Sequence, residues 1–288
     1  MSNPVFDRIN DGIRKGGYAS FEPRGRQAAP GTQPQYGQYA PQDIDARGLD
    51  DMYNQPSAGP VQMGRVTVDD VVMKGLGLFG LLLVTAGITG FVMPAGLAAT
   101  LILPAILVTL VLGLVIAFKK SVSVPLIVAY AALEGVLVGG VSRIYGNMFG
   151  QGVVTTAIVA TLSVFVAMFA GWKMGFIKVT DKSRRIFGMA ILGYMIFALA
   201  NLAAAWIFGA NSGWGFFGFG SGMSILVSVV AVGLASYSLA MDFDSIDRAV
   251  AAGLPQKYSW LLAHGLIVTV VWLYLEILRL VAQLQGRD

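Results

Sequence analysis

From Lys74 onward, long apolar runs alternate with short polar or glycine-rich breaks. Each run approaches the roughly 20 residues that an α-helix needs to cross a bilayer. The pattern therefore predicts an all-α fold, a bundle of seven membrane-spanning helices within residues 67–288. The expected spans are 74–93, 97–118, 123–144, 152–172, 185–208, 221–243 and 259–283.

Residues 1–66 follow a different pattern. This stretch is rich in Gln, Pro, Gly and Tyr and has no periodic apolar face. Such a segment cannot bury enough apolar surface to offset the entropy lost on ordering. We expect a disordered cytoplasmic tail.

Basic residues gather in every second loop, and so on one side of the predicted bundle. With the N-terminus inside, the inner side holds Lys74, Lys119, Lys120, Lys173, Lys178, Lys182, Arg184, Arg185, Arg248 and Lys257. The outer side holds only Arg143, Arg287 and Arg279. Because cytoplasmic loops are enriched in Lys and Arg, this asymmetry predicts a cytoplasmic N-terminus and an external C-terminus.

The composition supports a lipid environment. Of the 288 residues, 56% are hydrophobic and 12% are charged, about half the usual charged fraction of a soluble domain. The net charge of +4 is explained by the inner loops, so no nucleic-acid partner is expected. Gly135 and Gly139 form a small-xxx-small pair, which predicts close helix packing.

Three carboxylates lie within or at the edge of the predicted spans: Glu134, Asp242 and Glu276. A charge at the centre of a bilayer costs roughly 2.5–3.5 kcal/mol on insertion scales, so these groups are the first candidates for function. Asp242 and Glu276 differ in expected depth by about 9 Å if their helices stand upright. Tilt, or a longer sixth helix, would reduce this difference, and two adjacent carboxylates would share a proton.

Each acid also has a purely structural interpretation. Glu276 could form an ion pair with Arg279 one turn later, and Glu134 could be a neutral, hydrogen-bonded acid. Asp244 and Asp247 could belong to a solvated helix end. Two further polar residues have the same ambiguity: Asn201 as a contact between helices, and His264 as a structural group or a partner of Asp247.

Catalytic motifs are missing from the sequence. It contains no Gly-x-Ser-x-Gly elbow, no His-Glu-x-x-His zinc motif and no Walker loop. Without cysteine and with one histidine, it also lacks the usual soft metal ligands. We expect a protein that is not an enzyme and has no cofactor.

Several segments carry a family resemblance. They are Ala129-Tyr-Ala-Ala-Leu-Glu-Gly, Met241-Asp-Phe-Asp-Ser-Ile and Val271-Trp-Leu-Tyr-Leu-Glu-Ile-Leu-Arg-Leu, together with the opening Ser2-Asn-Pro-Val-Phe. With seven spans, the chain resembles the Bax inhibitor-1/YccA family, and most closely its bacterial YccA-like branch. The resemblance implies six helices around a central seventh, in the bacterial inner membrane. It also implies a pH-sensitive calcium leak gated by a carboxylate pair, here Asp242 and Glu276.

The leading hypothesis is therefore a cation leak protein, with calcium as the favoured ion. Asp242 and Glu276 would sense pH and bind calcium transiently, and Glu134 would be a further acid on the pathway. A second hypothesis is a non-conducting protein that binds other membrane proteins or proteases through its tail and inner loops. A third is a proton-coupled transporter.

Overall fold

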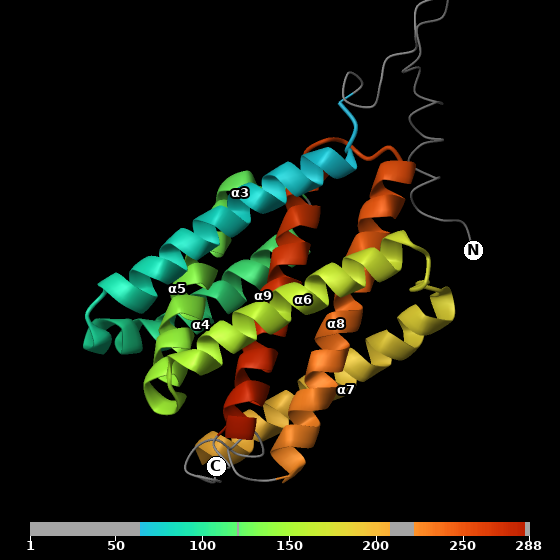
Figure 1. Ribbon diagram of the computed structural model, residues 1–288. Helices are drawn as coiled ribbons and strands as arrows, with labels where there is room; N and C mark the ends of the chain where they lie inside the picture. Colours follow the sequence, from blue (N-terminus) through green and yellow to red (C-terminus); the bar gives the residue numbers. More distant parts are fainter. Residues whose placement is uncertain (1–63, 120, 208–221, 286–288) are drawn as a thin grey trace, which may run out of the picture. The chain divides into compact units, whose positions relative to one another are not determined.

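The computed structural model describes residues 64–119, 121–207 and 222–285 (Figure 1). The chain divides into two units, Met1–Pro56 and Ser57–Asp288. All described residues belong to the second unit. The predicted tail, residues 1–66, therefore lies outside the described residues except for 64–66. The glycine-rich loop at 209–220 also lies outside them.

The described chain folds into successive helices. They are α3 (Val68–Gly87), the π-helical turn η1 (Ile88–Val92), α4 (Ala95–Phe118), α5 (Val124–Phe149), α6 (Gln151–Lys173), α7 (Asp181–Ile207), α8 (Gly222–Ala251) and α9 (Tyr258–Gln285). Seven helical segments are long and apolar enough to cross a membrane. The predicted all-α, seven-span fold is confirmed.

The helices extend further than the apolar runs. α8 continues past residue 243 to Ala251, through a stretch that contains Asp244, Asp247 and Arg248. Phe243, Ile246 and Ala249 recur every three residues in this stretch and are buried, so one helix face still packs inward. The spans were predicted short because hydropathy ends where charge begins, whereas helical periodicity continues.

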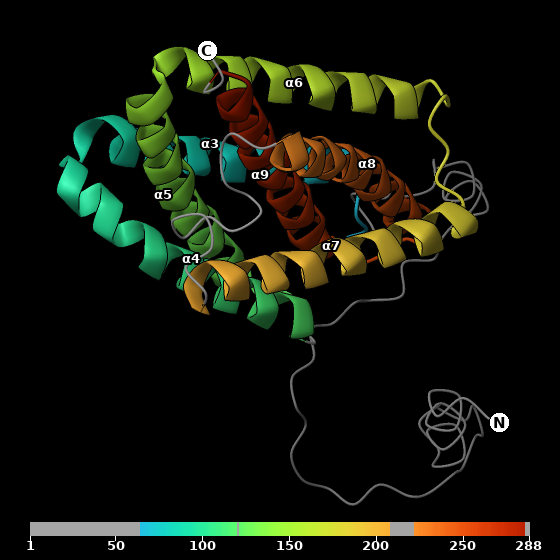
Figure 2. The ribbon, with the colours of Figure 1, turned by 90° about the horizontal axis from the view of Figure 1, so that it is seen from below.

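Helix α9 forms the centre of the bundle (Figure 2). It packs directly on α3, α5, α6 and α8, whereas α4 packs mainly on α5. Three side chains of α9 are fully buried: Leu273, Leu278 and Ala282. The helices around α9, in contrast, have one side that faces lipid. The predicted arrangement of six helices around a central seventh is confirmed.

Two glycines bring α3 and α5 into close contact. A Cβ atom added at Gly135 would lie 2.4 Å from the carbonyl oxygen of Leu82, and one at Gly139 would lie 2.2 Å from that of Ala86. No side chain fits at these distances, so glycine is required at both positions. The small-xxx-small pair of the sequence therefore marks a helix interface, as predicted.

The start of α3 is tied to the turn between α8 and α9. The amide of Val66 donates to the carbonyl oxygen of Leu254, and the amide of Gln256 donates to that of Gly64, both at 2.8 Å. The side-chain amide of Gln256 also donates to Asp70 at 2.9 Å. These contacts connect the first span to the α8–α9 turn.

Candidate functional site

One face of α9 carries a row of polar side chains. Thr269, Trp272, Glu276, Arg279 and Gln283 follow one another at intervals of three or four residues. Side chains at this spacing lie on the same side of a helix. Partners on α7 and α8 meet this face, so the three helices share a polar seam inside an otherwise apolar bundle.

Asp242 lies on α8 at one level of this seam. Its carboxylate is half-buried and lies beside the hydroxyl of Thr269 on α9. Its Oδ2 atom is buried and has no hydrogen-bond partner among the described residues. Most buried polar atoms in proteins have a hydrogen-bond partner, so this oxygen is an exception.

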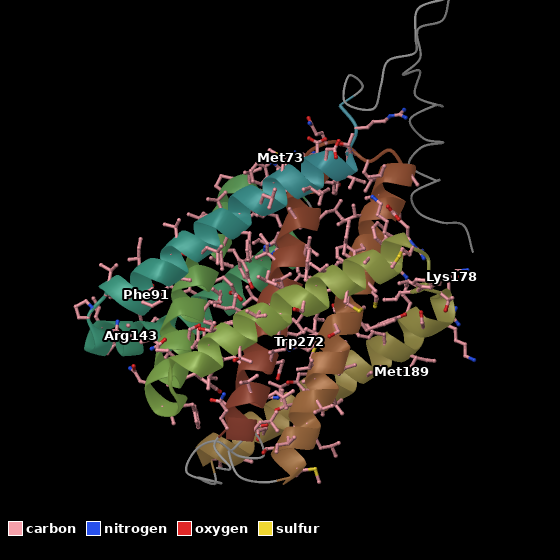
Figure 3. All side chains as sticks on the ribbon, in the orientation of Figure 1. Met73, Phe91, Arg143, Lys178, Met189 and Trp272 are labelled. Atoms are coloured by element: carbon pink, nitrogen blue, oxygen red, sulfur yellow. The ribbon has the colours of Figure 1, made fainter. Side chains whose placement is uncertain are left out.

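Glu276 lies at another level of the seam and is surrounded by partners. Its side chain is 6% exposed. The Tyr194 hydroxyl of α7 and the Trp272 indole, which is labelled in Figure 3, donate to its Oε1 at 2.6 and 3.2 Å. Arg279 Nη2 lies 2.6 Å from Oε2, an ion pair by distance that lacks the alignment of a hydrogen bond.

The ion pair extends into α8. Arg279 Nε donates to Ser228 Oγ at 3.0 Å, and that hydroxyl lies 2.9 Å from Gln283 Oε1. A buried ion pair is tolerated when further hydrogen bonds satisfy its members. The network therefore holds α7, α8 and α9 together through Glu276.

The two predicted gating carboxylates are not brought together. Asp242 lies beside Thr269, and Glu276 follows Thr269 by seven residues on the same face of α9. At 1.5 Å per residue, this places the two carboxylates about 10 Å apart along the helix. The extension of α8 does not remove the depth difference that helix arithmetic predicts, and Glu276 pairs with Arg279 instead.

Glu134 lies on the opposite side of α9. It is 8% exposed and forms a hydrogen bond with Tyr130, whose ring packs edge-on against His264 at 4.5 Å. Ser142 Oγ of α5 also lies 2.7 Å from Tyr274 OH of α9, so the two helices run in the same direction. Glu134 therefore lies near the depth of Asp242, on a different face of α9.

The other predicted polar groups have simpler roles. Asp244 forms ion pairs with Arg184 of α7 and with Arg248, the latter at 2.9 Å. Asp247 is exposed, as expected for a solvated helix end. His264 contacts Tyr130, which favours its structural interpretation over a contact with Asp247.

A second buried oxygen lies in the same part of the bundle. Tyr237 is on α8, five residues before Asp242, and its ring lies 5.2 Å from that of Phe187 on α7. Its hydroxyl has no hydrogen-bond partner among the described residues. In the described ranges, no three His, Cys, Asp or Glu side chains cluster as a metal site would require.

Sequence reasoning missed several members of the seam, among them Thr269, Tyr194 and Ser228. Each is a neutral residue inside an apolar run, where most such residues only pack. The polar spacing on α9 could have indicated Thr269, because it stands seven residues before Glu276. Tyr194 and Ser228 carry no such signal, since their contacts depend on how α7 and α8 are rotated.

Comparison with known proteins identifies the family of the chain. No curated protein matches the chain. The sequence model of the family described as Bax inhibitor 1 like matches residues 3–286, nearly the whole length. This multi-pass membrane protein therefore belongs to the Bax inhibitor-1-like family.

Proposed function

We propose that this protein is a pH-sensitive cation leak, with calcium as the favoured ion, gated at the interface of α8 and α9. One observation carries the proposal. Asp242 places a carboxylate between two packed helices, and one of its buried oxygens has no hydrogen-bond partner among the described residues. Acids inside membrane helices mark ion pathways more often than they mark structure.

The protonation state of Asp242 determines which packing is favoured. A protonated carboxyl tolerates the closed α8–α9 interface, because it carries no charge. An ionised carboxylate with a bare oxygen is costly in an apolar interior. Ionisation therefore favours a state in which water or a cation reaches Asp242, so conduction rises with pH.

The chemistry of the surrounding groups suits a hard cation. Calcium prefers oxygen ligands from carboxylates, carbonyls, hydroxyls and water. Asp242 and Thr269 offer such oxygens on one face of α9, and Glu134 offers another carboxylate near the same depth. We propose transient calcium binding at Asp242, with Glu134 as a second acid on the pathway.

Glu276 acts differently in this scheme. Its ion pair with Arg279 and its bond from Tyr194 hold α7 and α8 against α9. It is the second acid of the gate, but it works by fixing the helices that move rather than by sharing a proton with Asp242. A mutation there changes the stability of the closed bundle first and flux second.

We also propose a plasma membrane location with the N-terminus in the cytoplasm and the C-terminus outside. Basic residues lie near the start of α3 and α9 and near the end of α4, α6 and α8, and these helix ends all face the same side. The residues are Lys74, Lys119, Lys173, Arg248 and Lys257. This asymmetry follows the positive-inside rule. We propose a conducting protein that is not an enzyme.

The test is calcium flux from proteoliposomes between about pH 5 and pH 8, where a perturbed carboxyl would titrate. Wild-type flux should rise severalfold with pH. Asp242→Asn should remove the pH dependence, because the variant has no carboxyl to ionise. Asp247→Asn is the matched control, since it makes the same change on the same helix at an exposed position.

Glu276→Gln separates the two roles. It should lower the stability of the bundle while the remaining flux keeps its dependence on pH. Flux no greater than that of empty liposomes would contradict a leak. A pH profile that survives Asp242→Asn would contradict the assigned gate.

A further inference from the structure

A long groove separates α3 from α6 and has α9 as its floor. It consists of two cavities of about 470 and 400 Å³, each within the usual size range of ligand sites. The cavities share Phe79, Leu162 and Val270, so they form one continuous groove along the bundle. In Figure 1, α3 and α6 run roughly parallel, and the upper part of α9 is visible between them.

The groove opens toward the bilayer. Leu83 of α3 and Ile158 and Leu162 of α6 line it and are 52%, 46% and 47% exposed. Large apolar side chains with this exposure belong to the lipid-facing surface of a membrane helix. A molecule in the membrane can therefore enter the groove sideways, between α3 and α6.

The two ends of the groove differ in chemistry. The end nearer the start of α3 is lined by apolar side chains such as Phe165, Phe169 and Phe243, with no charged residue. The other end contains Arg143, Asn147 and Gln151, which are polar. One end thus suits a hydrocarbon chain and the other suits a polar headgroup.

Arg143 sets the charge of the polar end. Figure 3 shows it with Phe91 at the end of α3 that lies far from Met73. Its Nη1 donates to the carbonyl oxygen of Met93 at 2.5 Å, which orients the guanidinium. Among the described residues no acid lines either cavity, so the groove has a net positive end. Arg143 lies about 9 Å from the end of α5, a depth from which a long side chain reaches the interface.

Glycine leaves room beside this arginine. Gly87 and Gly90 line the groove, and Gly90 belongs to the π-helical turn η1. Such turns often occur at functional sites. Nothing lies within 4 Å of a Cβ atom built on Gly87, so a larger side chain there would project into the open groove without a clash.

We propose that this groove binds one phospholipid, with its phosphate at Arg143 and an acyl chain along the floor formed by α9. The guanidinium matches a phosphate in charge and in hydrogen-bond geometry. The apolar end matches an acyl chain in polarity. This site is separate from the Asp242 seam and does not depend on the leak.

The experiment is native mass spectrometry of the full chain, purified in detergent and incubated with palmitoyl-oleoyl phosphatidylglycerol. The wild-type protein should retain one lipid. Dioleoylglycerol, which lacks the phosphate, should bind much more weakly. Arg143→Gln should reduce phosphatidylglycerol binding about tenfold, the loss of one charge-assisted contact, and Arg143→Lys should reduce it less.

A matched pair of variants tests the groove itself. Gly87→Leu should weaken binding strongly, because the leucine side chain would occupy part of the groove beside its polar end. Gly80→Leu makes the same change on the same helix, at an exposed glycine that does not line the groove and has nothing within 4 Å, and should keep the lipid. Both variants should keep the melting temperature of the wild type, since neither meets a neighbour.

Two results would overturn the site. Equal lipid retention by Gly87→Leu and Gly80→Leu would mean that lipid binds elsewhere. Equal binding of dioleoylglycerol and phosphatidylglycerol, or an Arg143→Gln variant that binds like the wild type, would mean that no phosphate is recognised.

Discussion

Two carboxylates on the same seam of α9 have opposite surroundings. Glu276 is contacted by Tyr194, Trp272 and Arg279. Asp242 has a hydrogen bond with Thr269, and its buried Oδ2 has no partner in the part of the chain that the structure describes. Both are acids in membrane helices, about two turns apart. The difference shows that a buried acid can either hold helices together or gain and lose a proton, and that its hydrogen-bond and ion-pair partners determine which role it has.

The largest effect on stability is expected at Glu276, the acid whose oxygens have partners. Glu276→Gln should lower the free energy of unfolding by about 3–5 kcal/mol, because Arg279 would remain as a buried charge without its counter-ion. Thermal unfolding in detergent measures this loss. The double variant Glu276→Gln with Arg279→Met should recover much of it, and an equally unstable double variant would contradict the ion-pair account.

A smaller effect is expected from two tyrosines whose hydroxyl groups differ in their hydrogen bonds. Tyr194→Phe removes a hydrogen bond to a charged group and should cost about 1.5–3 kcal/mol. Tyr237→Phe removes a hydroxyl without a partner among the described residues, so it should be neutral or slightly stabilising. Equal losses in the two unfolding measurements would show that the hydroxyl of Tyr237 has a partner after all.

Asp242→Asn should change stability in the opposite direction to Glu276→Gln. At about pH 8 it should stabilise the closed bundle by about 1 kcal/mol, because an unpaired charge is removed. The difference between the two proteins should shrink as the pH falls, because protonation of the wild-type carboxyl removes that charge from the folded bundle. Melting curves at both pH values measure the difference, and a loss of stability at pH 8 would indicate an unseen partner for Asp242.

The smallest effect is expected at Asp247. This residue is exposed on α8, so Asp247→Asn should stay within about 0.5 kcal/mol of the wild type at either pH. The same melting curves include it as the reference for an acid in water. A larger change would mean that the end of α8 has contacts beyond the described residues.

The fold was predictable because its main signal is hydropathy. Seven apolar runs define seven helices, and the pair Gly135 and Gly139 marks a real contact between α3 and α5. The helix ends were less predictable, since α8 remains helical through Asp244 and Arg248, where hydropathy falls. The helical spacing of the apolar residues indicates where α8 ends, whereas the average hydropathy does not.

The sequence was enough to predict which acids belong to the candidate site, but not which residues contact them. Glu134, Asp242 and Glu276 stand out in sequence, and Arg279 one turn after Glu276 suggests the ion pair. The family resemblance implies that Asp242 and Glu276 act as one pair, whereas helix arithmetic indicates different depths, as the structure has them. Tyr194 and Ser228 could not be predicted, because their approach depends on helix rotations that local sequence does not specify.

The central claim is that Asp242 and Glu276 act as separate acids. Infrared difference spectra of the reconstituted protein between about pH 5 and pH 8 test it most directly, since they detect a carboxyl group as it loses its proton. The carboxyl band lost on raising the pH should be absent in Asp242→Asn and unchanged in Glu276→Gln. A band that disappears or shifts in both variants would show one proton shared by a coupled pair, and would contradict the account.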